Sequence, residues 1–195
     1  MHGFGQSTPL NALVSSDRLP ARGFRQVLIV GAERSDEFDD AKRMALHGHS
    51  VTIVNPRDTA VAARFEREGG SFIRSTIERL PTELGPFDLI CENYPYTVAR
   101  VAGACDDKPC PIWLSRREVR AYATARLKHL APTGQWIVFT ESPGFTYALQ
   151  SIVRNDETIR RHFNVRVVRL TKRQAPPSSY PHLTSRFKLV FKRSR

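Results

Sequence analysis

An acidic turn after the first apolar run limits the ligands that this chain can bind. The run Gln26–Val30 ends at Gly31, and the residues that follow include Glu33, Asp36 and Glu37. A helix that begins here has the positive end of its dipole at the turn, where a bound phosphate would meet these carboxylates. The sequence has neither the G-x-x-x-x-G-K-S/T nor the G-x-G-x-x-G pattern of phosphate-binding loops. The turn therefore disfavours nucleotide cofactors and tolerates a positively charged ligand without phosphate.

A polar and aromatic tetrapeptide, Asn93-Tyr94-Pro95-Tyr96, follows a second apolar run, Phe87–Glu92. Pro95 has no amide hydrogen for a strand ladder, so the strand is expected to end near it. Such a segment can recognise a ligand at the strand end. The alternative is a loop in which the tyrosines only cover the strand.

The remaining reactive residues form weaker patterns. Cys105 and Cys110 have a spacing known from some zinc pairs, but no second pair follows, so no metal site is predicted. No order of Ser, His, Asp or Cys indicates a nucleophilic triad. The chain has three cysteines, an odd number that argues against a disulfide framework and indicates a reducing, cytoplasmic location.

Alternating strands and helices must position these residues. Strands are expected at 26–31, 50–54, 71–74, 87–92, 135–140, 165–170 and 186–191, and helices at 35–47, 59–68, 116–130 and 145–161. The pattern predicts a doubly wound α/β fold: a mostly parallel seven-stranded sheet with helices on both faces. The last two strands have no helix between them, so we expect an antiparallel C-terminal edge. Ligands of such sheets bind beyond the carboxyl ends of the strands.

The length and composition indicate one domain. The chain has 195 residues, 41% of them hydrophobic, which suits an α/β domain over residues 25–195 preceded by an arm or lid at 1–24. No apolar stretch approaches the roughly 20 residues that span a bilayer, so no membrane partner is expected. The N-terminus also lacks the basic start and apolar segment of a signal peptide.

The positive charge is concentrated at the C-terminal end of the chain. Of the net charge of +11, +10 belongs to residues 154–195, which carry 12 basic and 2 acidic side chains. A basic edge attracts polyanions, and nucleic acid is the leading candidate; a merely solvated edge is the alternative. The residues predicted to contact nucleic acid are Arg166, Arg169, Lys172, Arg173, Arg186, Lys188, Lys192 and Arg193.

The order of these segments resembles the class I S-adenosylmethionine (SAM)-dependent methyltransferases, over roughly residues 24–193. The segments that follow the family's order are VLIVGAE, VTIVNP, SFIRSTIERLP, FDLICENYPY and LKHLAPTGQWIVF. The resemblance implies SAM as cofactor, whose sulfonium and ammonium groups suit the acidic turn.

The resemblance also assigns a cofactor site at three strand ends. Its residues would be Gly31, Ala32, Glu33, Asn55, Pro56, Thr76 and Ile77. Glu33 and Ser35 stand where the family has further glycines, and Asn55 and Thr76 stand where it has acids. A relative without catalytic activity therefore remains an alternative.

The segment Asn93-Tyr94-Pro95-Tyr96 resembles the N-P-P-Y motif of methyltransferases that act on amino nitrogens, with Tyr94 in place of the first proline. The resemblance assigns catalytic roles to Asn93, Pro95 and Tyr96: Asn93 accepts a hydrogen bond from the amine, and Tyr96 stacks on the planar acceptor. The expected function is SAM-dependent methylation of an amino nitrogen, with RNA or DNA favoured as acceptor. The alternatives are an inactive methyltransferase-like binding protein that uses the basic edge, and a small-molecule methyltransferase.

Overall fold

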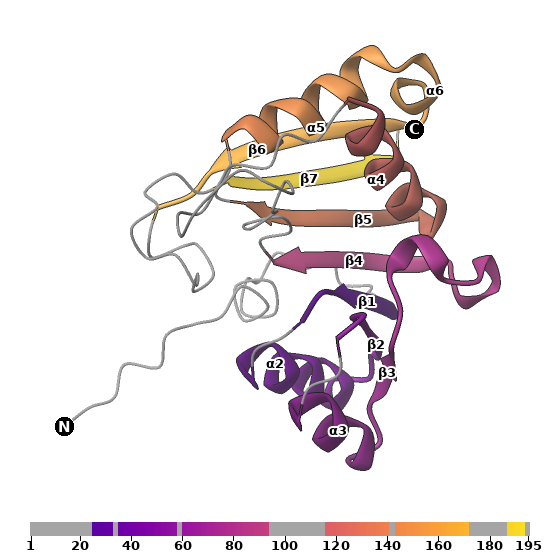
Figure 1. Cartoon of the computed structure of the whole chain (residues 1–195), viewed down its shortest axis with the longest axis vertical. Helices are drawn as coiled ribbons and strands as arrows, with labels where there is room; N and C mark the ends of the chain where they lie inside the picture. Colours follow the sequence, from indigo (N-terminus) through magenta and orange to yellow (C-terminus); the bar gives the residue numbers. More distant parts are fainter. Residues whose placement is uncertain are drawn as a thin grey trace, which may run out of the picture.

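A single seven-stranded sheet organises the chain (Figure 1). The computed structural model describes residues 25–32, 35–57, 60–93, 116–140, 143–171 and 187–193. The strand order is β3-β2-β1-β4-β5-β7-β6. The strands are β1 (Gln26–Val30), β2 (Ser50–Val54), β3 (Ser71–Ile73), β4 (Phe87–Asn93), β5 (Leu130–Thr140), β6 (Phe163–Arg169) and β7 (Phe187–Arg193).

The sheet confirms the predicted fold class. Strands β1 to β5 pair in parallel, whereas β7 is antiparallel to both of its neighbours, β5 and β6. The chain therefore adds its last strand one position inside the edge, and β6 forms the edge itself. The carboxyl ends of β1, β2, β3, β4 and β5 consequently meet at one end of the sheet.

Helices cover both faces of the sheet. They are α2 (Ser35–Leu46), α3 (Ala60–Arg67), α4 (Arg116–Lys128), α5 (Pro143–Asn155) and α6 (Glu157–Arg160), with short 3-10 helices η1 (Ile77–Arg79) and η2 (Thr82–Leu84). Side chains of α2 and α3 share one apolar layer, and those of α4, α5 and α6 share the other. In Figure 1 the first pair lies beside β1–β3 and the second group beside β5–β7. Among the described residues no helix is long and apolar enough to span a membrane.

Aromatic contacts hold each layer together. On the α4 side the ring of Trp136 stacks on that of Phe191, with centroids 4.1 Å apart. On the α2 side Phe38 packs against Phe65 and Phe72, with centroid separations of 5.5 and 6.2 Å. Because both faces are buried, β1 and β4 present apolar side chains to each layer, as their continuous apolar runs predict.

Two predicted helix boundaries are wrong. The helix expected over 145–161 is interrupted at Asp156, whose carboxylate accepts the amide hydrogens of Thr158 and Ile159 and so begins α6. The helix expected over 116–130 ends at Lys128, because Leu130 already pairs with Phe87 of β4. In the first case a side-chain cap ends the helix, and in the second case strand pairing does. Both act before the apolar periodicity ends.

The buried face of α2 also differs from expectation. The helical period over 35–47 would put Leu46 on the apolar face with Phe38 and Ala41, but Leu46 is 85% exposed, and Met44 lies in the core instead. Leu46 is the last residue of the helix, where the chain turns towards Gly48. Its side chain therefore buries little apolar surface against the core.

Matched leucine substitutions should separate these environments. We expect Leu189→Ala, at a fully buried position of β7, to lower the free energy of unfolding by about 2–5 kcal/mol. The same change at the exposed Leu46 should cost no more than about 0.5 kcal/mol. Urea denaturation of the two variants measures the difference, and equal losses would contradict the described core.

Candidate functional site

The carboxyl ends of the parallel strands bring the sequence-predicted site residues together. Val30 lies beside Val54 of β2 and beside Glu92 of β4, and Asn93 lies beside Phe139 of β5. Beyond these pairs the amide of Gly31 donates to the carbonyl of Val54 at 2.8 Å. The turns after β1, β2 and β4 thus begin at one edge of the sheet, as the family resemblance implies.

Gly31 forms the turn that starts this edge. Its φ of +75° is a backbone conformation that favours glycine, and no heavy atom lies within 4 Å of where a Cβ would stand. The next residue, Ala32, is buried. Glu33, the third predicted cofactor residue of this turn, lies outside the described residues.

Asn55 joins the turn after β1 to the turn after β2. Its Nδ2 donates to the carbonyl of Ala32 at 2.8 Å, and its Oδ1 accepts the amide of Arg57 at 2.9 Å. The side chain is buried, so these contacts fix both turns from within. Pro56, which follows it, is exposed. The structural role of Asn55 is therefore clear, whereas its contact with a ribose stays a prediction.

The segment after β3 places Thr76 and Ile77 differently. Thr76 precedes η1 and is partly exposed, and its backbone carbonyl accepts the Ser75 hydroxyl at 3.2 Å. Ile77 is buried in the apolar layer on the α4 side. Thr76 is therefore accessible to a ligand, whereas the side chain of Ile77 serves the core.

The predicted catalytic residues fall at the limit of the described chain. Asn93 is the last residue of β4, and its backbone pairs with β5. Pro95 and Tyr96 lie outside the described residues, as do Cys105 and Cys110. Within the described ranges no three His, Cys, Asp or Glu side chains are grouped so that they could hold a metal ion.

Buried acidic side chains surround the end of β4. Glu37 and Asp40 of α2 are buried, and so is Glu92 of β4. Burial raises the pKa of the Cys91 thiol to about 12, and the negative charges of Glu37, Glu92 and Asp40 add to this effect. Cys91 is therefore a protonated core residue, and burial is the main cause of its raised pKa.

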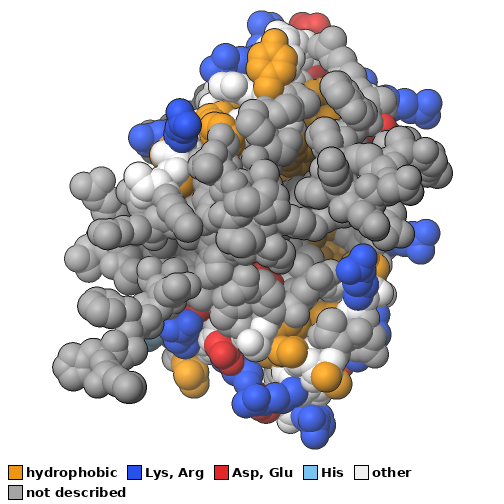
Figure 2. All heavy atoms as spheres, turned by 60° about the vertical axis from the view of Figure 1, so that its left-hand side comes forward, with side chains coloured by type: hydrophobic (Ala, Val, Ile, Leu, Met, Phe, Trp, Pro, Cys, Tyr) orange, Lys and Arg blue, Asp and Glu red, His pale blue; other side chains and the backbone are white. Residues whose placement is uncertain are grey.

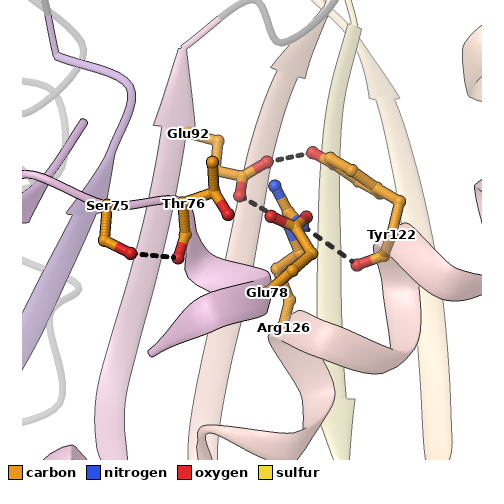
Figure 3. A network of polar contacts seen from close by, with 6 residues as sticks. All are labelled: Ser75, Thr76, Glu78, Glu92, Tyr122 and Arg126. Atoms are coloured by element: carbon orange, nitrogen blue, oxygen red, sulfur yellow. Dashed lines mark hydrogen bonds and ion pairs between the residues drawn. The ribbon is translucent and has the colours of Figure 1, made fainter. Parts of the chain in front are cut away.

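A buried polar network lies directly below this edge, and the sequence analysis did not predict it (Figure 3). Glu92, only 1% exposed, accepts the hydroxyl of Tyr122 and, at 2.7 Å, the Nε of Arg126. Arg126 also pairs with Glu78 of η1, and its guanidinium lies 3.7 Å from the centroid of the Tyr122 ring. The network thus joins β4, α4 and η1.

The charges of this network stabilise one another. Burial alone would lower the pKa of Arg126, but Glu92, Tyr122 and Glu78 raise it above its ordinary value, so the guanidinium stays protonated. Burial likewise favours a higher pKa for Glu78, and Arg126 outweighs this and lowers it. A charged residue at the end of an apolar strand, here Glu92, is the sequence signal that could have indicated a buried partner.

The described residues of the predicted basic edge lie on two faces of the sheet. Side chains alternate along a strand, so Val165 and Val167 face the α4 layer while Arg166 faces away. On β7 the same alternation puts Lys188 and Lys192 on the face of Arg166, and Arg193 on the α4 side. Burial lowers the pKa of Lys188, whose ammonium lies 5.8 Å from the Phe139 ring centroid. On the face drawn in Figure 2, the described Lys and Arg side chains lie at several separate places.

The other predicted contacts of this edge can be located only in part. Arg169 ends β6 and is exposed, on the same side of the strand as Val165 and Val167. Lys172, Arg173 and Arg186 lie outside the described residues. Their contact with nucleic acid stays a prediction.

Removing one partner of the buried ion pair should destabilise the fold more than removing both. We expect Arg126→Met to lower the free energy of unfolding by about 3–5 kcal/mol, because Glu92 keeps its charge without compensation. Adding Glu92→Gln should restore part of this loss, since an amide can still accept the Tyr122 hydroxyl. The control is Arg161→Met, in the exposed pair with Glu157, where about 0.5 kcal/mol or less is expected. Additive losses in the double variant, measured by urea denaturation, would contradict the coupling.

The chain is similar to solved structures of methyltransferases. No protein-family model and no curated protein matches the sequence. The chain is similar to 1,6-didemethyltoxoflavin-N1-methyltransferase from Burkholderia thailandensis, solved with S-adenosylhomocysteine, at 16% identity and a TM-score of 0.55, covering 86% of this chain and 70% of that one. It is also similar to an rRNA methylase from Streptococcus thermophilus, at 12% identity and a TM-score of 0.51, covering 88% of each chain.

A third similar structure is a predicted O-methyltransferase from Agrobacterium tumefaciens, at 13% identity and a TM-score of 0.56, covering 98% of this chain and 82% of that one. At such identities the likeness bears on the fold alone. Together with the strand order and the turn at Gly31, it shows that this chain has the class I methyltransferase fold.

Proposed function

We propose that this chain is a SAM-dependent methyltransferase that acts on an amino nitrogen, with nucleic acid as its acceptor. The observation that carries the proposal is the glycine turn at the switch point of the sheet, where β1 and β4 end, followed in the sequence by Glu33, Asp36 and Glu37. The buried carboxylates of Asp40 and Glu92 are paired with Arg43 and Arg126, so it is the acidic turn that makes this edge unfavourable for phosphate and favourable for a cation.

The residues at this edge fit SAM by charge and by backbone shape. Its sulfonium and ammonium groups are positive, and it has no phosphate. Gly31 and Ala32 would meet it at the turn after β1, Pro56 after β2 and Thr76 after β3, with Glu33 and Asn55 as further predicted contacts. When bound, SAM supplies an electrophilic methyl group.

Asn93 would hold the acceptor nitrogen. Its backbone is fixed by pairing with Phe139, so an amide oxygen at this position could accept a hydrogen bond from an amine at a defined place. Such a bond orients the nitrogen lone pair towards the methyl group, and this orientation supplies much of the rate in methyl transfer. Pro95 would shape the turn, and Tyr96 would stack on a planar base.

The acceptor class is supported by the overall charge and by two similar structures. The chain carries a net charge of +11, which favours a polyanion. The Burkholderia enzyme is named for methylation at N1 of its substrate, and the Streptococcus protein for methylation of rRNA. A cytoplasmic location, expected from the three cysteines, belongs to the same proposal.

A binding protein without methyl transfer is the second candidate. Both ends of the Asn55 amide are already engaged, with Ala32 and Arg57, where the family uses an acid for the ribose. A chain that has lost the cofactor could keep the fold through these contacts. Cofactor binding therefore separates the two candidates.

Calorimetric titration with SAM and with S-adenosylhomocysteine is the first test. We expect both to bind with micromolar affinity and to raise the melting temperature, whereas NAD and ATP, which carry phosphates, should not bind at this acidic edge. No heat and no thermal shift at millimolar SAM would reject the methyltransferase and favour the binding protein.

Substitution of Asn93 tests the proposed acceptor contact. We expect Asn93→Ala to lower kcat for transfer of a tritiated methyl group at least about a hundredfold, since the amine loses its orienting acceptor. The affinity for SAM should stay within about twofold of that of the unchanged protein. Asn164→Ala, at an exposed position of the edge strand β6, is the matched control. Unchanged turnover in Asn93→Ala would remove Asn93 from the mechanism.

A further inference from the structure

A groove of about 840 Å³ lies between α4, α6 and the strands β6 and β7. Its basic lining residues are Arg117, Arg120 and Lys128 of α4, Arg193 of β7, and His162, which lies between α6 and β6. Phe163 begins β6 and Arg193 ends β7, so the groove lies at the opposite end of the sheet from Gly31 and Asn93. It is separate from the candidate cofactor site.

The groove carries positive charge that the described residues do not neutralise. Arg117 and Lys128 are exposed and form no ion pair within the described ranges. Among the described lining residues Glu78 is the one acidic side chain, and it is paired with Arg126. A site with unpaired cations and a compensated acid attracts anions.

Two of the arginines are held in place by the walls of the groove. Arg120 pairs at 2.6 Å with Asp156, whose other oxygen caps α6. The guanidinium of Arg193 lies 5.2 Å from the Phe163 ring centroid and donates to the carbonyl of Leu130 at 3.3 Å. Their orientation is set before any ligand binds, which reduces the entropy lost on binding.

Apolar atoms make up most of the accessible lining of the groove, and its charged groups are basic except for Glu78. The larger apolar residues, Leu127, Ile159 and Phe163, are each less than 9% exposed. Arginine guanidinium groups bind phosphate through two parallel hydrogen bonds. We propose that this groove binds the phosphate backbone of a single-stranded nucleic acid.

This inference rests on the proposed function for its use in catalysis, because a nucleic acid held here must also reach Asn93. The seven residues of β4 rise about 3.3 Å each, so the two ends of the sheet are about 20 Å apart along this strand. A dinucleotide is too short to occupy both the groove and the candidate site. A strand of 20 nucleotides can occupy both, with one base at the site and its backbone in the groove.

The test is binding of a fluorescein-labelled 20-nucleotide single-stranded RNA, followed by fluorescence anisotropy in the absence of SAM. We expect Arg117→Glu/Lys128→Glu to weaken binding at least tenfold and to reduce the slope of log Kd against log salt by about 1–2. Arg67→Glu, an exposed arginine on α3 over the other face, is the control and should change Kd by less than twofold. If the charge reversal lowers the stability of the protein, the neutral variant Arg117→Gln/Lys128→Gln replaces it in the test. This variant should weaken RNA binding about fivefold.

The outcomes separate this inference from the proposed function. The inference is overturned if the 20-nucleotide RNA binds the double variant as tightly as it binds the unchanged protein. It is also overturned if the unchanged protein binds polyglutamate more tightly than the RNA. Loss of RNA binding in the groove variants supports it even if SAM does not bind, which would reject only the methyltransferase. If methylation occurs, the groove variants should raise KM for the 20-nucleotide RNA about tenfold and leave KM for a dinucleotide unchanged.

Discussion

The carboxylate of Glu92 is the constraint on which the candidate site depends. It is buried where β4 ends, and a charge in that position is stable only beside a counter-charge with good hydrogen bonds. Arg126 and Tyr122 supply both, so α4 must lie over the end of β4, and Glu78 brings η1 to the same place. The strand that ends in Asn93 is thereby tied to two other elements directly below the proposed site.

The same network connects the two ends of the sheet. Arg126, on the inner side of α4, is bound to Glu92 below the candidate site, whereas Arg117 and Lys128 of the same helix face the groove between α4 and α6. A single helix therefore joins the buried carboxylate below the candidate site to the basic groove. In the proposed function this separation would keep the phosphates of a nucleic-acid acceptor away from the acidic turn after β1.

Much of the fold could be predicted from the sequence, because strands buried on both faces read as continuous apolar runs. The runs at Gln26–Val30 and Phe87–Glu92 identified the two central strands, and the missing helix before the last strand indicated the antiparallel addition. The errors have local physical causes. Asp156 caps a new helix inside a longer apolar pattern, and Leu46 follows the helical period at a position where the chain already turns away from the core. The spacing of apolar residues indicates neither the cap at Asp156 nor the turn of the chain at Leu46.

The sequence by itself determined the order of the elements, the glycine turn and the acidic residues that disfavour phosphate, since these depend on neighbours along the chain. Only the tertiary structure decided which charges meet. Arg126 is 34 residues from Glu92 and 48 residues from Glu78 along the sequence, and no local pattern relates them. The alternation of side chains along β6 and β7 also divides the described C-terminal charge between two faces, and Arg193 of β7 lines the same groove as Arg117 and Lys128 of α4. The net charge of a sequence is a sum over its residues, whereas a binding surface depends on the direction in which each charged side chain points. On β6 and β7 that direction is fixed only when the strands pair.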